Sequence, residues 1–273
     1  MFRLEKFYPQ GFNPQQYWDD KYSQEHIAGK SSEEFRKQGF WPLLQKHLQK
    51  GKRYLDVGCG IGGWILFLKE EGYDVEGIDI AARTVRALTE YDPDLRVKVA
   101  SMTAIPYPDA SLDGVLAVGT LEYVDGKVPE ALREVQRVLK PGGVFFMEVP
   151  IANTVRRLFY IPLKQLEKMI RPAIAKATAG KQGYGAKPVF ANYLFDRGEL
   201  KHMLAAAGFE VVDEQAHELP EEDSHYGLYV DWPFLRGSEP YKLNRLGKMV
   251  KDLANSLSPW VASTGAVLVA RKK

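Results

Sequence analysis

The 273-residue sequence is poor in cysteine, which excludes an internal disulfide. Its single cysteine, Cys59, has no second thiol to pair with, so a reducing compartment is the natural one and we expect a cytoplasmic protein. Long apolar runs are also missing. No stretch approaches about 18 uninterrupted apolar residues, which predicts that nothing spans a membrane. The first residues, MFRLEKFYPQGF, lack the apolar run of a signal peptide.

Motifs for several kinds of chemistry are absent as well. The five histidines are scattered, there is no cysteine-rich set or H-x-x-x-H pair, and no serine–histidine–aspartate series can be placed. We therefore expect no metal centre and no activated nucleophile. The formal net charge of +2, from 37 basic and 35 acidic residues, is too small to indicate nucleic-acid binding by itself.

The sequence does have enough apolar side chains for a large core. It is 45% hydrophobic, which suits one globular domain over 1–273, with or without an added cap. Short apolar runs lie at 53–57, 74–80, 97–100, 112–118 and 144–149, and helical patterns lie at 63–71, 82–90 and 128–139. This alternation predicts an α/β fold with a parallel sheet and helices on both faces.

The pattern changes after Pro150. Residues 151–190 carry eight basic residues and one acid, Glu167. Regular order returns at Asp196, which is placed to cap a helix with Glu199 three residues on. Gly208 ends that helix, a strand is predicted at 209–214, and GAVLVARKK closes the sequence as a last strand.

A glycine-rich loop, YLDVGCGIGGW, follows the first predicted strand of this sheet. Its glycines at Gly58, Gly60 and Gly63 read G-x-G-x-x-G, the dinucleotide fingerprint. Such a loop lets a ligand approach the backbone, and the following helix N-terminus favours anionic groups. Asp79, 19 residues after Gly60, is placed to accept hydrogen bonds from ribose hydroxyls. These features suit a dinucleotide and other adenosine-containing cofactors alike.

Asp56 separates the two cofactor classes. It lies two residues before Gly58, where its carboxylate would repel the two negative charges of a pyrophosphate. S-adenosylmethionine instead carries a cationic amino group and a sulfonium, and an acid at that position attracts both. The alternative interpretation of Asp56 is a cap for its own loop.

Five stretches together resemble a class I S-adenosylmethionine-dependent methyltransferase of the small-molecule branch that includes the ubiquinone and menaquinone methyltransferases. They are LDVGCGIGGW, GIDI, MTAIPYPDASLDGVLAVGTLEYV, ALREVQRVLKPGGVFFMEVP and FDRGELKHMLAAAGFEVV. The resemblance is strong over 53–150, moderate over 195–215 and faint elsewhere. It implies a Rossmann-like seven-stranded sheet whose antiparallel last strand, GAVLVARKK, is inserted beside FEVVDE.

The resemblance also implies a cofactor, S-adenosylmethionine, with S-adenosylhomocysteine as product, and a role for each matching position. Asp56, Gly58, Gly60 and Gly62 would hold the methionine part, Asp79 the ribose, Ile80 and Met102 the adenine, and Gly119 would pass near the sulfonium. The family commonly has an acid after the third strand that bonds the adenine amino group. This sequence has Ser101 there, which can still accept a hydrogen bond.

Residues 1–50 are expected to form an N-terminal helical cap. Within it, Tyr17 and Trp18 resemble the segment that closes over the cofactor in relatives, where an aromatic face attracts a cation. The alternative is that both residues pack an N-terminal helix onto the core.

Two acceptor-side candidates, Glu122 and Tyr123, follow the fourth strand, at the carboxyl edge where ligands bind in such sheets. Relatives often carry EH or HH at this place, so either residue could orient an acceptor hydroxyl or amine. The alternative is a helix-start carboxylate and a packed ring. His225 and Tyr226 are a second possibility.

The segment 151–195 is expected to be an inserted, basic, helical lid over the acceptor. A second interpretation is an amphipathic surface helix that contacts anionic lipid through 151–190, and a third is a solvated basic face. Nucleic acid is not expected as a partner, since GTLEYV replaces the N/D-P-P-Y/F/W signature of base-methylating enzymes.

Three functions follow from these patterns. The first is a methyltransferase that acts on a small molecule by in-line displacement at oxygen, nitrogen or carbon, including a membrane-associated lipid or quinone-like acceptor. The second is a methyltransferase-fold protein that binds cofactor or a partner without turnover. The third, an NAD-dependent oxidoreductase, is disfavoured by Asp56 and by the motifs that follow it.

Overall fold

A computed structural model describes residues 1–7, 13–23, 27, 31–162, 165, 166, 188–218, 235 and 243–273 of the chain. The chain divides into two compact units. The larger consists of residues 11–149, 198–215 and 267–273, and the smaller of residues 1–10, 150–197 and 216–266.

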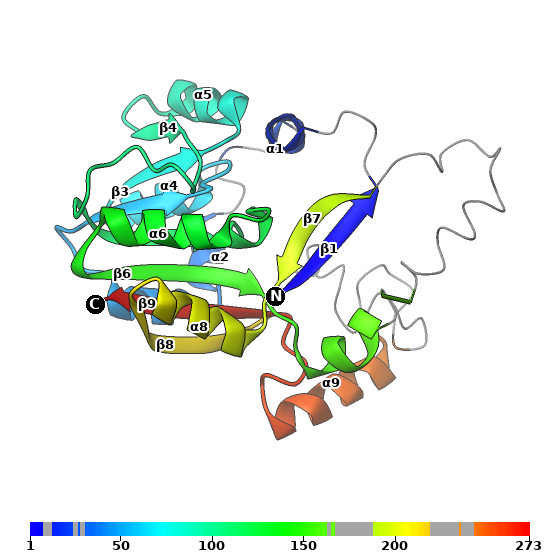
Figure 1. Ribbon diagram of the computed structural model, residues 1–273. Coiled ribbons are helices and arrows are strands. Elements are labelled where there is room, and N and C mark those ends of the chain that lie inside the picture. The colour runs from blue at the N-terminus through cyan, green and yellow to red at the C-terminus, as the bar shows by residue number, and fades with distance from the viewer. Residues whose placement is uncertain are drawn as a thin grey trace, which may run out of the picture. The chain divides into compact units, whose positions relative to one another are not determined.

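The larger unit is built on a seven-stranded sheet with the strand order β4-β3-β2-β5-β6-β9-β8. The strands are β2 (Arg53–Val57), β3 (Asp74–Asp79), β4 (Val97–Val99), β5 (Leu112–Val118), β6 (Leu139–Pro150), β8 (Phe209–His217) and β9 (Gly265–Lys272). The pairs β2–β3, β2–β5, β3–β4 and β5–β6 are parallel. β9 lies between β6 and β8 and runs against β6 (Figure 1). The predicted α/β sheet with an inserted antiparallel last strand is confirmed.

Helices cover both faces of this sheet. They are α2 (Ser32–Arg36), α3 (Trp41–His47), α4 (Gly63–Glu70), α5 (Ala82–Tyr91), α6 (Val128–Val138) and α8 (Arg197–Ala206), and α1 (Pro14–Tyr22) lies beyond the carboxyl ends of the strands. In Figure 1, α6 and α8 lie in front of the sheet and α2 and α4 behind it. The rear face holds an aromatic core in which Phe35 of α2 stacks on Phe67 of α4, with ring centroids 5.2 Å apart. Such ring pairs add to the free energy gained by burial.

α6 shows why the helical patterns were readable from the sequence. Its buried residues are Val128, Ala131, Leu132, Val135 and Val138, which share one face at helical spacing. β6 departs from the prediction, because it begins at Leu139 and not at Val144. Leu112 pairs with Leu139, and the register then shifts so that Gly114 pairs with Val144. The KPGG stretch is therefore an irregular part of the strand.

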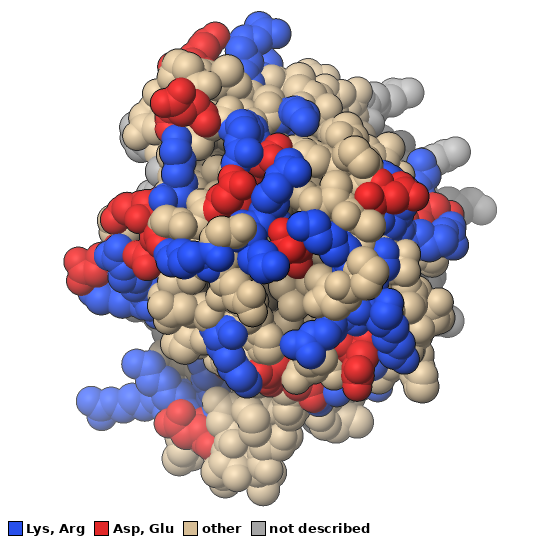
Figure 2. All heavy atoms as spheres, turned by 90° about the vertical axis from the view of Figure 1, so that its left-hand side faces the viewer, with Lys and Arg blue, Asp and Glu red and all other residues tan. Residues whose placement is uncertain are grey.

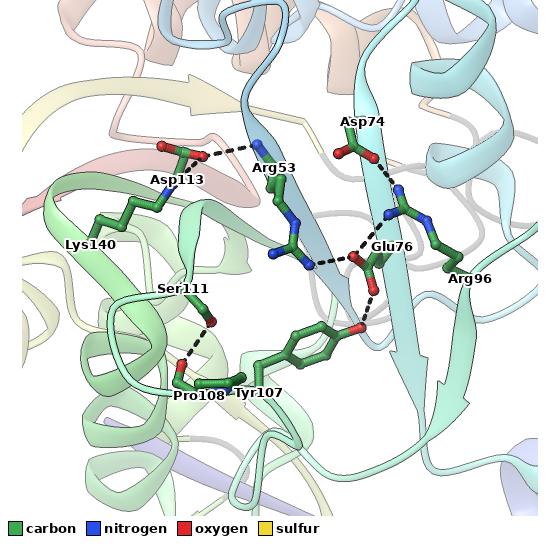
Figure 3. Close-up of polar contacts among 9 residues, drawn as sticks. All are labelled: Arg53, Asp74, Glu76, Arg96, Tyr107, Pro108, Ser111, Asp113 and Lys140. Atoms are coloured by element: carbon green, nitrogen blue, oxygen red, sulfur yellow. Dashed lines mark hydrogen bonds and ion pairs between the residues drawn. The ribbon is translucent and has the colours of Figure 1, made fainter.

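Charges of both signs lie side by side on the face shown in Figure 2. A group of polar and charged side chains ties strand β2 to β3 and to the segment before β5 (Figure 3). The buried Glu76 carboxylate accepts hydrogen bonds from the Arg53 guanidinium at 2.9 Å and the Tyr107 hydroxyl at 2.7 Å. Burial alone would raise the pKa of Glu76, but these donors and Arg96 hold it below its usual value.

Asp113 connects strands β2, β5 and β6 through its carboxylate, as Glu76 connects β2 and β3. Its carboxylate accepts a hydrogen bond from the Arg53 backbone N–H at 3.0 Å and forms an ion pair with Lys140 at 2.8 Å (Figure 3). A carboxylate that is held in this way has a lowered pKa, and that is the direction for Asp113, although burial acts against it. Asp113 is thus a structural residue at the start of β5.

The smaller unit contains two strands within the segments 1–50 and 151–195, where we expect helices, while α1, α2 and α3 of 1–50 are helical. β1 (Phe2–Phe7) is a strand and pairs antiparallel with β7 (Pro188–Leu194), with Phe2 opposite Leu194. Helical structure is present in η2 (Arg156–Tyr160), a π-helical turn, and in α9 (Arg245–Leu257). No helix in the described part of the chain is long and apolar enough to cross a membrane.

Arg156, the first of the eight basic residues in 151–190, is buried. The interpretation of this segment as an exposed basic surface is therefore wrong for this residue. Arg156 is 2% exposed, and its guanidinium donates to the carbonyls of Ile151 at 2.7 Å and Thr264 at 2.8 Å. Arg157 is exposed and forms an ion pair with Asp196. The other six basic residues, and also His225 and Tyr226, lie outside the described residues.

We expect Gly114→Ala to lower the free energy of unfolding by about 1–3 kcal/mol, because it overpacks the core. Gly114 pairs with Tyr54 across β2 and β5, and a Cβ on Gly114 would lie 2.6 Å from the rigid Tyr54 ring. Urea denaturation measures the change. Gly39→Ala is the control, since a Cβ there meets nothing within 4 Å. Equal stability of the two variants would contradict the packing argument.

Candidate active site

The candidate site lies where the parallel strands β2, β3 and β5 end. Parallel strands bring their carboxyl ends to one edge of the sheet. The register places Asp56 of β2 opposite Leu116 of β5, and Asp79 of β3 opposite Val99 of β4. The carboxyl ends of β2, β3, β4 and β5, with the segments that follow them, carry the cofactor and acceptor positions expected between Asp56 and Tyr123. All of these positions belong to the larger unit.

The glycine loop depends on backbone conformations that other residues rarely adopt. Gly58, Gly60 and Gly62 all have positive φ, at 74°, 49° and 78°. A Cβ on Gly58 would lie 2.3 Å from the Thr120 hydroxyl oxygen, and one on Gly62 would lie 2.6 Å from Leu88. Gly62 is also the left-handed N-cap of α4. The three glycines therefore give the loop its conformation and allow neighbouring side chains to pack closely against its backbone.

Asp79 joins the glycine loop to the start of α5. One of its carboxylate oxygens accepts from the Gly60 N–H at 2.8 Å, and the other accepts from the Ala81 N–H at 2.8 Å. The side chain is 5% exposed, and this burial raises its pKa, while the N–H donors act in the opposite direction. Each carboxylate oxygen has a second lone pair, so Asp79 can also accept from two neighbouring hydroxyl groups.

Asp56 is a second buried acid at the same edge. It is 2% exposed, and burial together with the charge of Asp79 raises its pKa to about 7. In the described part of the chain, no hydrogen bond or ion pair reaches the Asp56 carboxyl. It therefore does not cap its own loop. Two adjacent buried acids disfavour an anionic ligand and favour a cationic one.

The positions expected near an adenine follow β3 and β4. Ile80 comes directly after Asp79 and is half-buried, and Met102 is 4% exposed. The Ser101 hydroxyl already has partners in its own turn, because it lies 2.9 Å from the Thr103 hydroxyl and accepts from the Thr103 N–H at 3.2 Å. Ser101 is thus a turn residue that keeps acceptor capacity.

The acceptor-side residues follow β5. Gly119 has a φ of 64°, and a Cβ there would lie 3.8 Å from the Glu122 carboxylate. Glu122 and Tyr123 lie in η1 (Leu121–Tyr123), a single 3₁₀ turn. Glu122 is 5% exposed and Tyr123 is 40% exposed, so the acid is the buried member of the pair and the ring the accessible one.

Aromatic rings of α1 lie over this edge. The Trp18 ring stacks on Tyr22 at 5.5 Å between centroids and meets Tyr123 edge-on at 4.8 Å. Tyr17 is 37% exposed and meets Trp18 edge-on at 5.3 Å. The Tyr22 ring lies against the glycine loop, since a Cβ on Gly60 would be 3.0 Å from it.

The structure adds three residues that the sequence patterns did not single out, namely Asp19, Tyr22 and Thr120. The helical spacing of NPQQYWDDKY carried a signal for Tyr22, which lies four residues after Trp18 and hence on the same helix face. No local pattern points to Asp19 or Thr120, because their partners lie far along the chain. Among the described residues, no group of three or more histidine, cysteine or acidic side chains could hold a metal ion.

The geometry fits S-adenosylmethionine better than a dinucleotide. Asp79 suits a ribose, and the buried pair of acids suits the amino and sulfonium cations of the methionine part. The pyrophosphate of a dinucleotide would instead face Asp56, an acid with no cation beside it in the described chain.

Comparison with known proteins agrees with this fit. Residues 32–214 match the family described as a methyltransferase domain. The 2-methyl-6-phytyl-1,4-hydroquinone methyltransferase of Synechocystis is 41% identical over 101 residues, which span 36% of this chain and 31% of that protein. A demethylmenaquinone methyltransferase of Symbiobacterium thermophilum is 27% identical over 201 residues, 68% of this chain and 79% of that one.

A solved structure supports the same fold. A protein of Methanosarcina mazei described as an S-adenosylmethionine-dependent methyltransferase superposes with a TM-score of 0.57 at 22% identity, and the match covers 85% of this chain and 97% of that one. The match to the family extends over more than half of the chain and includes the glycine loop, both buried acids and the acceptor-side turn. The chain belongs to the methyltransferase-domain family.

Proposed function

We propose that the chain transfers a methyl group from S-adenosylmethionine to a small-molecule acceptor. The observation that carries the proposal is the buried pair Asp56 and Asp79 beside the glycine loop. This edge offers carboxylate oxygens that can accept from ribose hydroxyls, together with a negative charge that no cation of the described chain compensates. A cytoplasmic location fits this function and the single, buried Cys59.

The roles of the cofactor-side residues follow from their positions. Asp79 accepts from the ribose hydroxyls, Ile80 and Met102 cover the adenine, and Asp56 attracts the amino group of the methionine part. When bound, S-adenosylmethionine supplies a methyl group that is already activated for displacement. The protein therefore has to align acceptor and cofactor and exclude water, and needs no nucleophile of its own.

Glu122 and Tyr123 are the acceptor contacts in this proposal. The buried Glu122 carboxylate can take a proton from an acceptor hydroxyl or amine as a general base. The exposed Tyr123 ring, edge-on to Trp18, offers a flat apolar wall. The names of two relatives refer to a hydroquinone and to demethylmenaquinone, so hydroquinone rings are the acceptor class that we propose first.

We expect Asp79→Ala to weaken S-adenosylhomocysteine binding at least tenfold, because two hydrogen bonds to a charged group are lost. Isothermal titration calorimetry of the purified chain measures this. Asp74→Asn is the matched control, since Asp74 opens the same strand at its opposite end. Absence of binding to the unaltered chain would overturn the proposed cofactor, and equal binding by Asp79→Ala would overturn the role of Asp79.

The affinity for S-adenosylhomocysteine should rise between pH 6 and pH 8. With a pKa of about 7, Asp56 passes from roughly one-tenth to nine-tenths ionised over this range, and the ionised form attracts the amino group. Asp79 and Cys59 are the titratable groups beside it, and the pKa of both is raised. Titrations at several pH values should give a slope that Asp56→Asn removes. A flat profile for the unaltered chain would contradict this assignment.

The titration of Asp56 also predicts the opposite pH trend for the stability of the ligand-free fold. Folding raises the pKa of Asp56, so the folded state binds the proton more tightly, and its stability falls as the pH rises through about 7. Thermal denaturation at pH 5.5 and pH 8.5 should show a smaller fall in Tm for Asp56→Asn than for the unaltered chain.

Glu122→Gln should lower the rate of methyl transfer to a hydroquinone by about 100-fold or more while S-adenosylhomocysteine affinity stays within about twofold. Transfer of a labelled methyl group from S-adenosylmethionine measures the rate. A parallel loss of cofactor affinity would assign Glu122 to the cofactor and not to the acceptor.

A further inference from the structure

Helix α5 begins without a cap of its own. Its N-cap residue is Ala81, which has no side chain that could accept a hydrogen bond, and its first turn contains no acid. The backbone N–H groups at a helix start need acceptors, and the helix dipole favours a negative charge there. α5 starts directly after Asp79 and Ile80, so the condition of this helix end affects the adenosine side of the proposed cofactor site.

Asp19 of α1 supplies the missing cap from another part of the chain. Its carboxylate accepts from the Arg83 N–H at 2.8 Å and from the Thr84 N–H at 3.4 Å. These are the second and third residues of α5, the positions that an N-cap side chain normally serves. Asp19 is 7% exposed, and its second oxygen lies 3.6 Å from the Arg83 guanidinium. A buried carboxylate with this set of partners is fixed in place.

The helix that contains Asp19, α1, also carries the aromatic rings that lie over the proposed site. Trp18 comes directly before Asp19 in the chain and reaches Tyr123 on the acceptor side. Tyr22, one helical turn after Trp18, lies against Gly60 of the glycine loop. Asp19 is therefore the buried polar anchor of a helix whose rings cover the loop that would hold the methionine part.

We propose that Asp19 is a positioning residue that latches α1 over the bound cofactor. By capping α5, it couples the helix that follows the ribose contact to the aromatic roof formed by Trp18 and Tyr22. The inference rests on the proposed function, because it assumes that S-adenosylmethionine occupies this edge. Release of the cofactor then requires the roof to lift, so the latch acts chiefly on the dissociation rate.

Asp20 provides a matched control at the neighbouring position. It is an exposed acid that forms an ion pair with the side chain of Arg83, whereas Asp19 binds the backbone of α5. Both substitutions remove one negative charge from α1 near the same arginine. They differ in whether the cap on α5 is lost.

The experiment measures S-adenosylhomocysteine dissociation from the full chain by stopped-flow displacement with excess S-adenosylmethionine. Asp19→Ala should dissociate at least tenfold faster than the unaltered chain, and Asp20→Ala should stay within about twofold. Asp19→Asn should lie between the two, because an amide oxygen can still accept from the backbone. Equal dissociation rates for the unaltered chain and Asp19→Ala would overturn the latch.

A second variant separates the latch from simple stabilisation of α5. Ala81→Ser adds a hydroxyl at the N-cap and so can cap α5 within its own chain segment. In Asp19→Ala/Ala81→Ser, the Tm should recover toward that of the unaltered chain while dissociation stays fast. Recovery of slow dissociation would mean that Asp19 acts through α5 alone, and would overturn the proposed role of the aromatic roof formed by Trp18 and Tyr22.

Hydrogen exchange gives a readout that needs no ligand. Asp19→Ala should increase the exchange rate of the α1 amides at 15–22 by at least tenfold and leave those of α4 at 63–70 unchanged. Unchanged exchange in α1 would overturn the latch. Absence of S-adenosylhomocysteine binding to the unaltered chain would instead overturn the proposed function, so the two failures are distinguishable.

Discussion

The site depends on one carboxylate, that of Asp79, which is shared between two loops. It holds the Gly60 N–H on one side and the Ala81 N–H on the other. These two bonds fix the glycine loop relative to the start of α5, and they do so at a buried position where an unmade hydrogen bond would be costly. The glycine loop and the start of α5 take their places from this arrangement. In the proposed function, a substitution at Asp79 therefore removes a structural tie together with the ribose contact.

Electrostatics has opposite effects at the two ends of the parallel strands. At the amino ends, Glu76 and Asp113 are surrounded by basic donors, so their charges are compensated and their pKa values are lowered. At the carboxyl ends, Asp56 and Asp79 lie buried beside each other, and their pKa values are raised. The first arrangement ties strands together. The second stores an uncompensated negative charge that a cationic ligand can neutralise, at the expense of stability in the ligand-free fold.

Much of the fold around the glycine loop could be predicted from the sequence, because the spacing of apolar residues in each strand and helix reflects how that element is buried. Buried parallel strands are short apolar runs, and α6 shows one apolar face in its spacing. Patterns of this kind say little about partners that are distant in sequence. β1 and β7 pair across more than half of the chain, and neither has a sequence feature that names the other. The same holds for Asp19, whose partner α5 begins more than sixty residues later, and for Arg156, which looked like surface charge and is buried on backbone carbonyls.

The position of β9 has a consequence for how the chain acquires this structure during synthesis. β9 is made after the other six strands of this sheet, yet it lies between β6 and β8. Until it emerges, β6 and β8 each present an open edge with unpaired backbone groups, which is the arrangement most prone to pairing with another chain. The glycine loop and both buried acids are by then already translated. The nascent protein can therefore assemble most of its proposed ligand edge while β8 and one edge of β6 still wait for β9, and this interval is where chaperone protection matters most.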